Sequence, residues 1–404
     1  MPALREPNVP HVPSSDPARL RAIKRHLWRS DQRFLATCAL GVEGMLAEEV
    51  ACLEGASEVV ARPGGASFRA PFDTLYQALL NLRLAESLRV VLASEVAAAT
   101  FPMLFDQLTR VRWSLWLPRV CALTVRVSTH RSRLRDREGL EEALIGALRR
   151  HGVEPREADA PAMTVHLRLD ADRATAQLDL GGPLYRRSGD KWVSRTTIRE
   201  TTAAALVRLA EVASADLVLD PFCGSGTLLS EALEASLGLA PGRRRTPPFA
   251  ASPAWKAERE RHAMRRQEAA RNPERSVPHL GSDADARAVA IAERNMSAAG
   301  LDDHARLSVA KSQELDLGRL AQQHGAGSPL LLSNPPYGRA ASAVGSTPHR
   351  LLRDLLSGAP GWRFALLYPD IDAITDEPWL EIERRLPVVT SGLRNALVVG
   401  SVRR

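Results

Sequence analysis

The pattern of apolar and polar positions predicts strands and helices that alternate along most of the chain. Residues 34–38 form a short apolar run typical of a strand, and residues 42–53 carry acidic side chains on one side of an amphipathic helix. Residues 72–82 repeat the helical pattern, and residues 88–92 form another strand. We therefore expect a small α+β unit over residues 33–95.

A second unit follows with the same kind of alternation. Residues 101–111 and 138–150 have the periodicity of helices, residues 121–128 predict a strand, and residues 163–180 contain two apolar runs that predict a hairpin. These elements predict another α+β unit over residues 96–183.

Residues 184–404 contain the apolar runs expected of a parallel sheet. Residues 217–219 form a buried strand that ends at Asp220, residues 280–282 form a second short strand, and residues 330–332 form a third. A helical pattern follows the first two strands. This order is typical of an α/β domain with a parallel sheet.

The composition fits a globular protein with two or three domains, since 45% of the 404 residues are hydrophobic and 25% are charged. No apolar run approaches the roughly 20 residues that span a bilayer. Residues 1–32 are rich in proline and lack the apolar core of a secretion signal, which predicts a flexible arm. We expect a cytoplasmic protein without a membrane partner.

The cysteines and histidines predict neither a metal site nor a disulfide framework. Cys38, Cys52, Cys121 and Cys223 are scattered and form no CxxC pair, and the ten histidines show no metal-ligand spacing. We therefore expect a metal-free protein.

The net charge is +7 and the pI is about 9.7, which favours a polyanionic partner, although an arginine-rich genome would produce a similar excess. An insertion at about residues 238–278 concentrates this charge, because residues 241–275 hold ten Arg or Lys against four Glu. Arginines also occupy every second position from Arg131 to Arg137. If this segment is extended, the four arginines lie on one side and can contact successive phosphates. The segment can equally be a solvated loop, and the sequence does not favour one interpretation over the other.

The strand that ends at Asp220 is followed by a turn with two glycines, Gly224 and Gly226, and then by a helix. Glycines let the backbone approach a ligand, and an acid at the strand end can hold its polar groups, as in nucleotide-binding turns. Asp283 ends the next strand, where an acid suits the hydroxyls of a ribose. Either Asp283 or Asp285 can instead cap the following helix.

Asn334-Pro335-Pro336-Tyr337 follows the third strand and has a chemistry of its own. An exocyclic amino group on a purine is a poor nucleophile, because its lone pair is delocalised into the ring. The side-chain oxygen of Asn334 and the carbonyl of Pro335 can accept both N–H bonds and localise that pair, while the prolines fix the backbone. Tyr337 offers a flat face on which an extruded base can stack.

These two motifs, at residues 220–227 and 334–338, resemble those of the class I S-adenosylmethionine-dependent amino-methyltransferases. The chain is more similar still to the THUMP-containing RNA guanine-N2 methyltransferases, with the branch that modifies large-subunit ribosomal RNA as the best match. The similarity runs from about residue 33 onward. The further stretches that carry it are residues 36–49, 64–68, 82–87, 184–189, 198–205, 240–249 and 281–283.

The resemblance implies a ferredoxin-like unit at residues 33–95, a THUMP RNA-binding unit at 96–183 and a Rossmann-like class I methyltransferase domain at 184–404. It also implies that the protein transfers a methyl group from S-adenosylmethionine to the N2 amine of a guanosine in rRNA or tRNA. Separately, we expect a monomer. The methyl donor is already activated as a sulfonium, so the step needs positioning rather than a metal or a strong base.

The resemblance and the motifs together give the expected site residues. The catalytic residues are Asn334, Pro335 and Tyr337. The cofactor-binding residues are Asp220, Phe222, Cys223, Gly224, Ser225, Gly226, Thr227, Asp283, Ser312 and Asn334. The RNA-binding residues are Arg131, Arg133, Arg135, Arg137, Arg186, Arg187, Arg243, Arg244 and Arg245.

The chain departs from the family pattern at two places. Where relatives often carry an acid that contacts the cofactor adenine, this chain offers Ser312 or Gln313. After Gly338 it has Arg339-Ala340 in place of Glu-Arg, which leaves the modified RNA position open.

Two other functions are consistent with the motifs. An adenine-N6 methyltransferase acting on DNA or RNA would use the same Asn-Pro-Pro-Tyr chemistry, but DNA enzymes do not usually carry a THUMP-like half. A non-catalytic RNA-binding assembly factor would not need the intact motifs at both strand ends.

Overall fold

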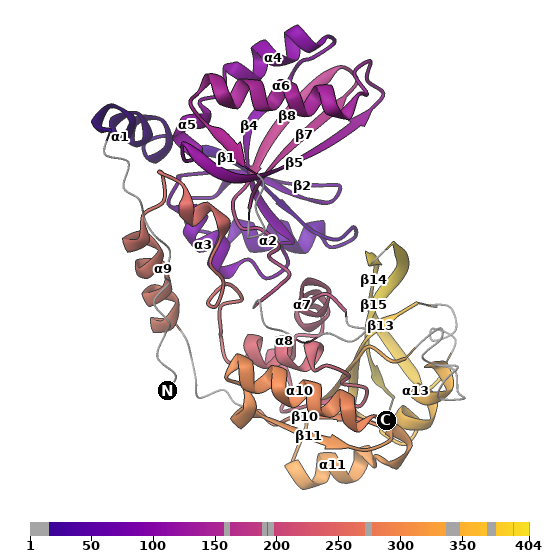
Figure 1. The fold of residues 1–404 in the computed structure, drawn as a ribbon. Helices are drawn as coiled ribbons and strands as arrows, with labels where there is room; N and C mark the ends of the chain where they lie inside the picture. Colours follow the sequence, from indigo (N-terminus) through magenta and orange to yellow (C-terminus); the bar gives the residue numbers. More distant parts are fainter. Residues whose placement is uncertain are drawn as a thin grey trace. The chain divides into compact units, whose positions relative to one another are not determined.

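The computed structural model describes residues 16–156, 162–187, 192, 198–270, 277–336, 348–369, 377–390 and 392–403. The chain divides into two compact units (Figure 1). Unit 1 comprises Met1–Thr37, Leu46–Leu184 and Arg244–Arg265, and unit 2 comprises Cys38–Met45, Tyr185–Arg243 and Arg266–Arg404. No helix in the described part of the chain is long and apolar enough to cross a membrane.

Unit 1 is built on one eight-stranded sheet with the order β2-β3-β1-β4-β8-β7-β5-β6. Its strands are β1 Gln32–Thr37, β2 Ser57–Arg62, β3 Gly65–Ala70, β4 Ser87–Ala97, β5 Val120–His130, β6 Glu154–Arg156, β7 Met163–Asp170 and β8 Arg173–Asp179. Strand β4 pairs with both β1 and β8, so the two α+β units expected from the sequence share one continuous sheet.

The helices of unit 1 each bury apolar side chains. They are α1 Pro17–Ile23, the π-helical segment η1 Lys24–Trp28, α3 Thr74–Asn81, α4 Phe101–Thr109, α5 Trp113–Trp116 and α6 Arg137–Arg150. Helix α2, Glu43–Ala51, begins in unit 2 and ends in unit 1.

The flexible arm predicted for residues 1–32 is wrong for its second half, because α1 and η1 are ordered helix. The side chain of Asp16 caps α1 by accepting from the N–H of Ala18 at 2.9 Å. Leu27 is buried, and the Trp28 ring lies 5.0 Å from that of Phe72. Apolar side chains at a helical spacing within a Pro-rich stretch thus anchor this segment.

Part of the basic insertion packs on unit 1. Its elements are η3 Pro248–Ala251 and α9 Ala257–Ala269. Phe249 is fully buried and its ring lies 6.3 Å from that of Phe72, while the Trp255 and Tyr76 rings are 4.5 Å apart. The Tyr76 hydroxyl accepts from the N–H of Lys256 at 2.8 Å. An aromatic cluster therefore anchors this segment to unit 1. In the sequence, the basic residues are the main feature of this segment.

Unit 2 is a doubly wound α/β domain with the strand order β11-β10-β9-β12-β13-β15-β14. Its strands are β9 Leu217–Asp220, β10 His279–Asp283, β11 Ala305–Val309, β12 Pro329–Ser333, β13 Arg363–Tyr368, β14 Leu380–Thr390 and β15 Leu393–Val402. Its helices are α7 Glu200–Leu209, η2 Val212–Ser214, α8 Thr227–Ser236, α10 Ala286–Ala299, η4 Asp302–His304, η5 Ser312–Glu314, α11 Leu317–His324 and α13 Pro348–Leu356.

The topology of unit 2 determines where a ligand can bind. Strand β9 lies between β10 and β12 and is parallel to both, so the chain winds to opposite sides from this point. In open α/β sheets, ligands bind outside the carboxyl ends of the strands where the winding direction changes. The carboxyl ends of these strands carry Asp220, Asp283 and Asn334, which confirms the predicted Rossmann-like fold class.

Candidate active site

The turn after β9 is shaped by its two glycines. Gly224 has φ +54° and Gly226 has φ +79°, a left-handed region that side chains disfavour. A Cβ on Gly226 would lie 3.2 Å from the Cβ of Ala292, so Gly226 allows α10 to approach. A Cβ on Gly224 would meet no atom closer than 4.0 Å, which leaves its backbone open to a ligand. The two glycines therefore serve different purposes.

Asp283 ties the end of β10 to this turn. Its Oδ2 accepts from the N–H of Gly224 at 3.0 Å, and its Oδ1 accepts from the N–H of Asp285 at 3.0 Å. Asp285 caps α10 by accepting from the N–H of Arg287 at 2.9 Å. The sequence allowed either acid to cap α10. In the structure Asp285 caps this helix, and Asp283 accepts a hydrogen bond from the glycine turn.

Asp220 is a buried carboxyl group with an unusual pKa. Burial raises its pKa to about 7; the N–H of Phe222 at 3.2 Å opposes this increase, and the nearby charge of Asp283 adds to it. A cationic ligand beside this carboxyl group would favour its charged form.

Cys223 is a neutral packing group in the same turn. Burial raises the pKa of its thiol, and the charges of Asp220 and Asp283 raise it further. The thiol therefore stays protonated near neutral pH and offers no nucleophile. All four cysteines of the chain are free thiols.

The end of β12 brings Asn334 beside the end of β9. The hydroxyl of Ser333, which is fully buried, donates to Asp220 Oδ1 at 3.5 Å. Pro335 is also buried. The side-chain oxygen of Asn334 is shielded from solvent and accepts no hydrogen bond from the described residues. Tyr337 lies outside the described residues.

A buried acceptor without a partner needs an explanation, because it costs about 1–3 kcal/mol. A ligand N–H group would satisfy Asn334 Oδ1. This is the role that the sequence assigned to it.

The remaining cofactor residues lie in or near the same region. Ser225 and Thr227 are buried, and Phe222 is half-buried. Ser312 is buried at the start of η5, beyond the end of β11. Its contact with the cofactor adenine stays a prediction.

Sequence reasoning missed Asn295 on α10. This buried side chain donates through Nδ2 to the carbonyls of Ser225 and Trp192, both at 2.9 Å, and its Oδ1 accepts from the N–H of Trp192 at 3.0 Å. The sequence does contain one signal that could have identified Asn295. It is an amide side chain on the apolar side of a helix, between the buried residues Ala292 and Met296.

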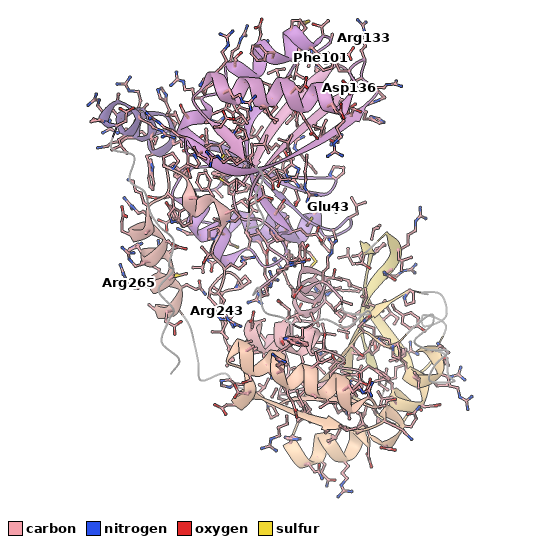
Figure 2. All side chains as sticks on the ribbon, viewed as in Figure 1. Glu43, Phe101, Arg133, Asp136, Arg243 and Arg265 are labelled. Carbon is pink, nitrogen blue, oxygen red and sulfur yellow. The ribbon has the colours of Figure 1, made fainter. Side chains whose placement is uncertain are left out.

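The arginine row does not form the extended segment that its spacing predicted. Strand β5 ends at His130, and Arg137 is already the first residue of α6. Arg131 pairs with Asp170 at 3.1 Å, and Arg133, which Figure 2 labels, pairs with Asp172 at 3.3 Å. Arg135 donates to the carbonyl of Ser132 at 3.1 Å, and Arg137 pairs with Glu141 at 2.7 Å. Because Arg131, Arg133 and Arg137 remain exposed, these ion pairs are weak and leave phosphate contact possible.

Three other predicted RNA contacts have internal partners instead. Arg187 is buried and donates to Glu231 at 2.7 Å, so it does not offer the surface contact that we expected. Arg243 pairs with Glu234 at 2.8 Å, and Arg245 donates to the carbonyl of Leu79 at 2.7 Å. Arg186 and Arg244 are exposed, and their RNA contact stays a prediction.

Within the described ranges, no group of three or more His, Cys, Asp or Glu side chains is arranged to hold a metal ion.

Comparison with known proteins identifies two regions of the chain. Residues 190–359 match the family described as an RMKL-like methyltransferase domain, and residues 33–90 match the RlmL ferredoxin-like domain. The protein is 31% identical over 328 residues to the ribosomal RNA large subunit methyltransferase K/L of Syntrophotalea carbinolica, an alignment that covers 77% of this chain and 45% of the relative. It is 30% identical over 360 residues to the protein of that name from Methylococcus capsulatus, with coverages of 83% and 46%. The chain thus spans about half the length of these curated relatives.

Solved structures share the fold across both units. SMU.472, crystallised with SAH, aligns with a TM-score of 0.80 at 23% identity and covers 93% of this chain and 99% of its own. TrmN from Thermus thermophilus aligns with a TM-score of 0.63 at 20% identity and covers 92% and 99%. The chain thus contains a region that matches the RMKL-like methyltransferase domain, preceded by a region that matches the RlmL ferredoxin-like domain.

Proposed function

We propose that this protein transfers a methyl group from S-adenosylmethionine to the exocyclic N2 amine of a guanosine in RNA. The match of residues 190–359 to the RMKL-like methyltransferase domain supports methyl transfer, and the names of the two relatives, both ribosomal RNA large subunit methyltransferases, support an RNA substrate. The THUMP assignment of residues 96–183, a monomeric and metal-free enzyme, and a cytoplasmic location belong to the same proposal.

The observation that carries the proposal is the side-chain oxygen of Asn334 at the switch point of the sheet, which accepts no hydrogen bond from any residue that the structure describes. This buried acceptor follows β12, whose last residue, Ser333, contacts Asp220 at the end of β9. A target amine held here would donate one N–H to Asn334 Oδ1 and the other to the Pro335 carbonyl. Both bonds localise the nitrogen lone pair, because they favour the geometry and charge that the nitrogen acquires as it attacks.

The donor side of the site fits S-adenosylmethionine. The open backbone at Gly224 and the carboxylates of Asp220 and Asp283 lie at the ends of adjacent strands β9 and β10. Asp283, fixed by two backbone N–H groups, would hold ribose hydroxyls. Asp220 provides negative charge near a cationic ligand. When bound, the sulfonium supplies an activated methyl group, so the protein needs only to position and to stabilise charge.

The proposal is tested with labelled S-adenosylmethionine and unmodified large-subunit rRNA or tRNA as substrates, followed by nucleoside analysis of the product. We expect N2-methylguanosine, and we expect Asn334→Ala to lower the rate by about a hundredfold, because removal of one such polar group typically has this effect. Gln322→Ala, which removes an exposed amide from the same unit, is the matched control.

A methyladenine product would replace this proposal with an adenine-N6 methyltransferase. Failure to bind S-adenosylmethionine in calorimetry would favour the non-catalytic assembly factor. A rate for Asn334→Ala within a few-fold of wild type would show that the assigned mechanism is wrong.

A further inference from the structure

The sheet of unit 1 is covered by helices on one face in its second half. Helix α4 packs on β4 and helix α6 packs on β5, on one face of the sheet (Figure 1). On β7 the alternation is clear, because Val165, Leu167 and Leu169 are fully buried while Arg168 is exposed. The opposite face of β5, β7 and β8 therefore carries the other half of the alternating side chains.

Two rows of polar side chains cross this opposite face. Strand pairing aligns Arg126, His166 and Gln177 in one row, and Ser128, Arg168 and Thr175 in the next. These six residues, which we call the polar sheet face, come from three adjacent strands. Within each strand the two members lie two residues apart, so all six side chains point to the same side.

The cations on the polar sheet face are accessible. Arg126 is exposed and has no ion pair or hydrogen bond with the described residues. Arg168 pairs with Asp170 at 3.3 Å, but its side chain is 67% exposed, and such a surface pair contributes little. A phosphate group can therefore compete for both guanidinium groups.

His166 adds a neutral polar ring between these cations. Burial, together with the charges of Arg89 and Arg126, lowers its pKa to about 4. At neutral pH the neutral imidazole can therefore donate one hydrogen bond and accept another without adding charge. Arg89 of β4 reaches the same row, where its Nη1 donates to the side-chain oxygen of Gln177 at 3.4 Å.

The chemistry of the polar sheet face argues for one kind of partner. None of its six residues has an aliphatic or large aromatic side chain, although Val91 of β4 pairs with Gln177 at the end of the first row. The centre of a protein interface, by contrast, is apolar or aromatic. It also lacks the Phe, Tyr or Trp platform on which an unpaired base stacks. Guanidinium, hydroxyl and amide groups are those that contact phosphate oxygens and the ribose 2′-hydroxyl.

We propose that the polar sheet face binds the sugar–phosphate backbone of the RNA substrate. The inference rests on the proposed function, because it takes RNA as the substrate. Contact with the backbone fixes the register of the RNA without reading its sequence. Arg131 and Arg133, which pair with Asp170 and Asp172 just beyond the strand ends, continue the basic surface along the same edge.

The test uses the full chain carrying Arg126→Gln and Arg168→Gln together, with fluorescence anisotropy of a labelled large-subunit rRNA fragment over a range of salt concentrations. We expect about tenfold weaker binding, and a slope of log K against log salt that is lower by about two units, because two phosphate contacts are lost. The corresponding Lys double variant should keep most of the affinity.

The matched control removes Arg306 and Arg319, two exposed arginines of unit 2, by the same change to Gln. Thermal unfolding and S-adenosylmethionine affinity should be unchanged in both double variants. If wild type binds and methylates RNA but the Arg126/Arg168 variant matches the control in affinity and salt slope, the polar sheet face is not the RNA surface. If wild type itself neither binds nor methylates RNA, the proposed function fails instead.

Discussion

The side-chain amide of Asn295 donates to the carbonyl oxygen of Ser225 at 2.9 Å and so ties helix α10 to the glycine turn. The same amide holds both backbone groups of Trp192. Asn295 is 7% exposed, so its three hydrogen bonds form away from water. One side chain thus fixes the position of the turn that would bind the methyl donor.

Replacement of Asn295 should weaken cofactor binding without touching the cofactor. Asn295→Asp keeps the shape and the acceptor but cannot donate to Ser225 or to the Trp192 carbonyl. We expect the free energy of unfolding to fall by about 1–3 kcal/mol, and S-adenosylmethionine to bind at least several-fold more weakly. Calorimetry and thermal unfolding measure the two effects. Ser297→Ala, on the exposed side of α10, is the control.

A variant Asn295→Asp with wild-type cofactor affinity would show that the turn keeps its shape without this hydrogen bond. Loss of affinity with unchanged stability would instead place Asn295 in direct contact with the ligand.

The pKa of Asp220 makes the stability of unit 2 dependent on pH. In the unfolded chain an aspartate has a pKa near 3.9, whereas burial raises that of native Asp220 to about 7. Between these values the native state binds more protons than the unfolded state, so stability falls as pH rises from about 4 to about 7. The effect is at most about 4 kcal/mol, since each pKa unit corresponds to 1.36 kcal/mol.

Asp220→Asn removes this titration and keeps an acceptor for the N–H of Phe222. As the pH rises from 4.5 to 8, the melting temperature of wild type should therefore fall relative to that of the variant. A difference that is constant over this range would mean that the native carboxyl group titrates near its ordinary value.

The residues at the strand ends could be predicted because the sequence pattern that identifies a strand is local. Apolar runs identify the parallel strands, and parallel strands bring their carboxyl ends to one edge of the sheet. Asp220, Asp283 and Asn334 were identified on this basis, and the structure places all three at the ends of β9, β10 and β12. The choice between Asp283 and Asp285 needed coordinates, since either acid could accept from a backbone N–H.

Contacts between distant positions could not be predicted from the pattern. Asn295 and Ser225 are 70 residues apart, and the sequence around either residue does not indicate that the two form a hydrogen bond. The charge of the insertion concealed Phe249, whose role depends on the aromatic rings it meets in unit 1. The spacing of Arg131–Arg137 predicts an extended row only where no helix begins. In the structure a helix does begin there, because Asp136 caps it by accepting from the N–H of Gly139.

The aromatic cluster makes the insertion part of the core of unit 1. Phe249→Ala should lower the free energy of unfolding by about 3–5 kcal/mol, because it leaves a cavity among the rings of Phe72, Trp116 and Trp255. Phe249→Leu should cost less, and Val60→Ala, at an exposed position, should change stability by no more than about 0.5 kcal/mol. Denaturant unfolding of the full chain measures the three variants.

The same packing predicts how the chain tolerates truncation. A fragment that ends at Leu184 lacks the residues of unit 1 between Arg244 and Arg265, so it should unfold more readily or aggregate. Equal stability of Phe249→Ala and wild type, or a well-folded fragment 16–184, would show that the insertion is dispensable for unit 1.

The ion pair between Arg187 and Glu231 distinguishes a structural arginine from an RNA contact. Their side chains are 9% and 2% exposed and 2.7 Å apart. Removal of one partner from a buried pair typically costs about 3–5 kcal/mol, since it leaves an uncompensated charge. Arg187→Met and Glu231→Gln should therefore both lower the melting temperature, whereas the double variant Arg187→Met/Glu231→Leu should recover part of the loss.

RNA affinity decides whether Arg187 has a second role. At a temperature where all variants remain folded, Arg187→Met should bind the labelled rRNA fragment as wild type does, because its guanidinium group is not at the surface. Arg186→Met provides the comparison, since Arg186 is the exposed neighbour. If Arg187→Met keeps wild-type stability but loses RNA affinity, the guanidinium group must leave Glu231 to meet a phosphate, and the contact first expected from the sequence would be correct.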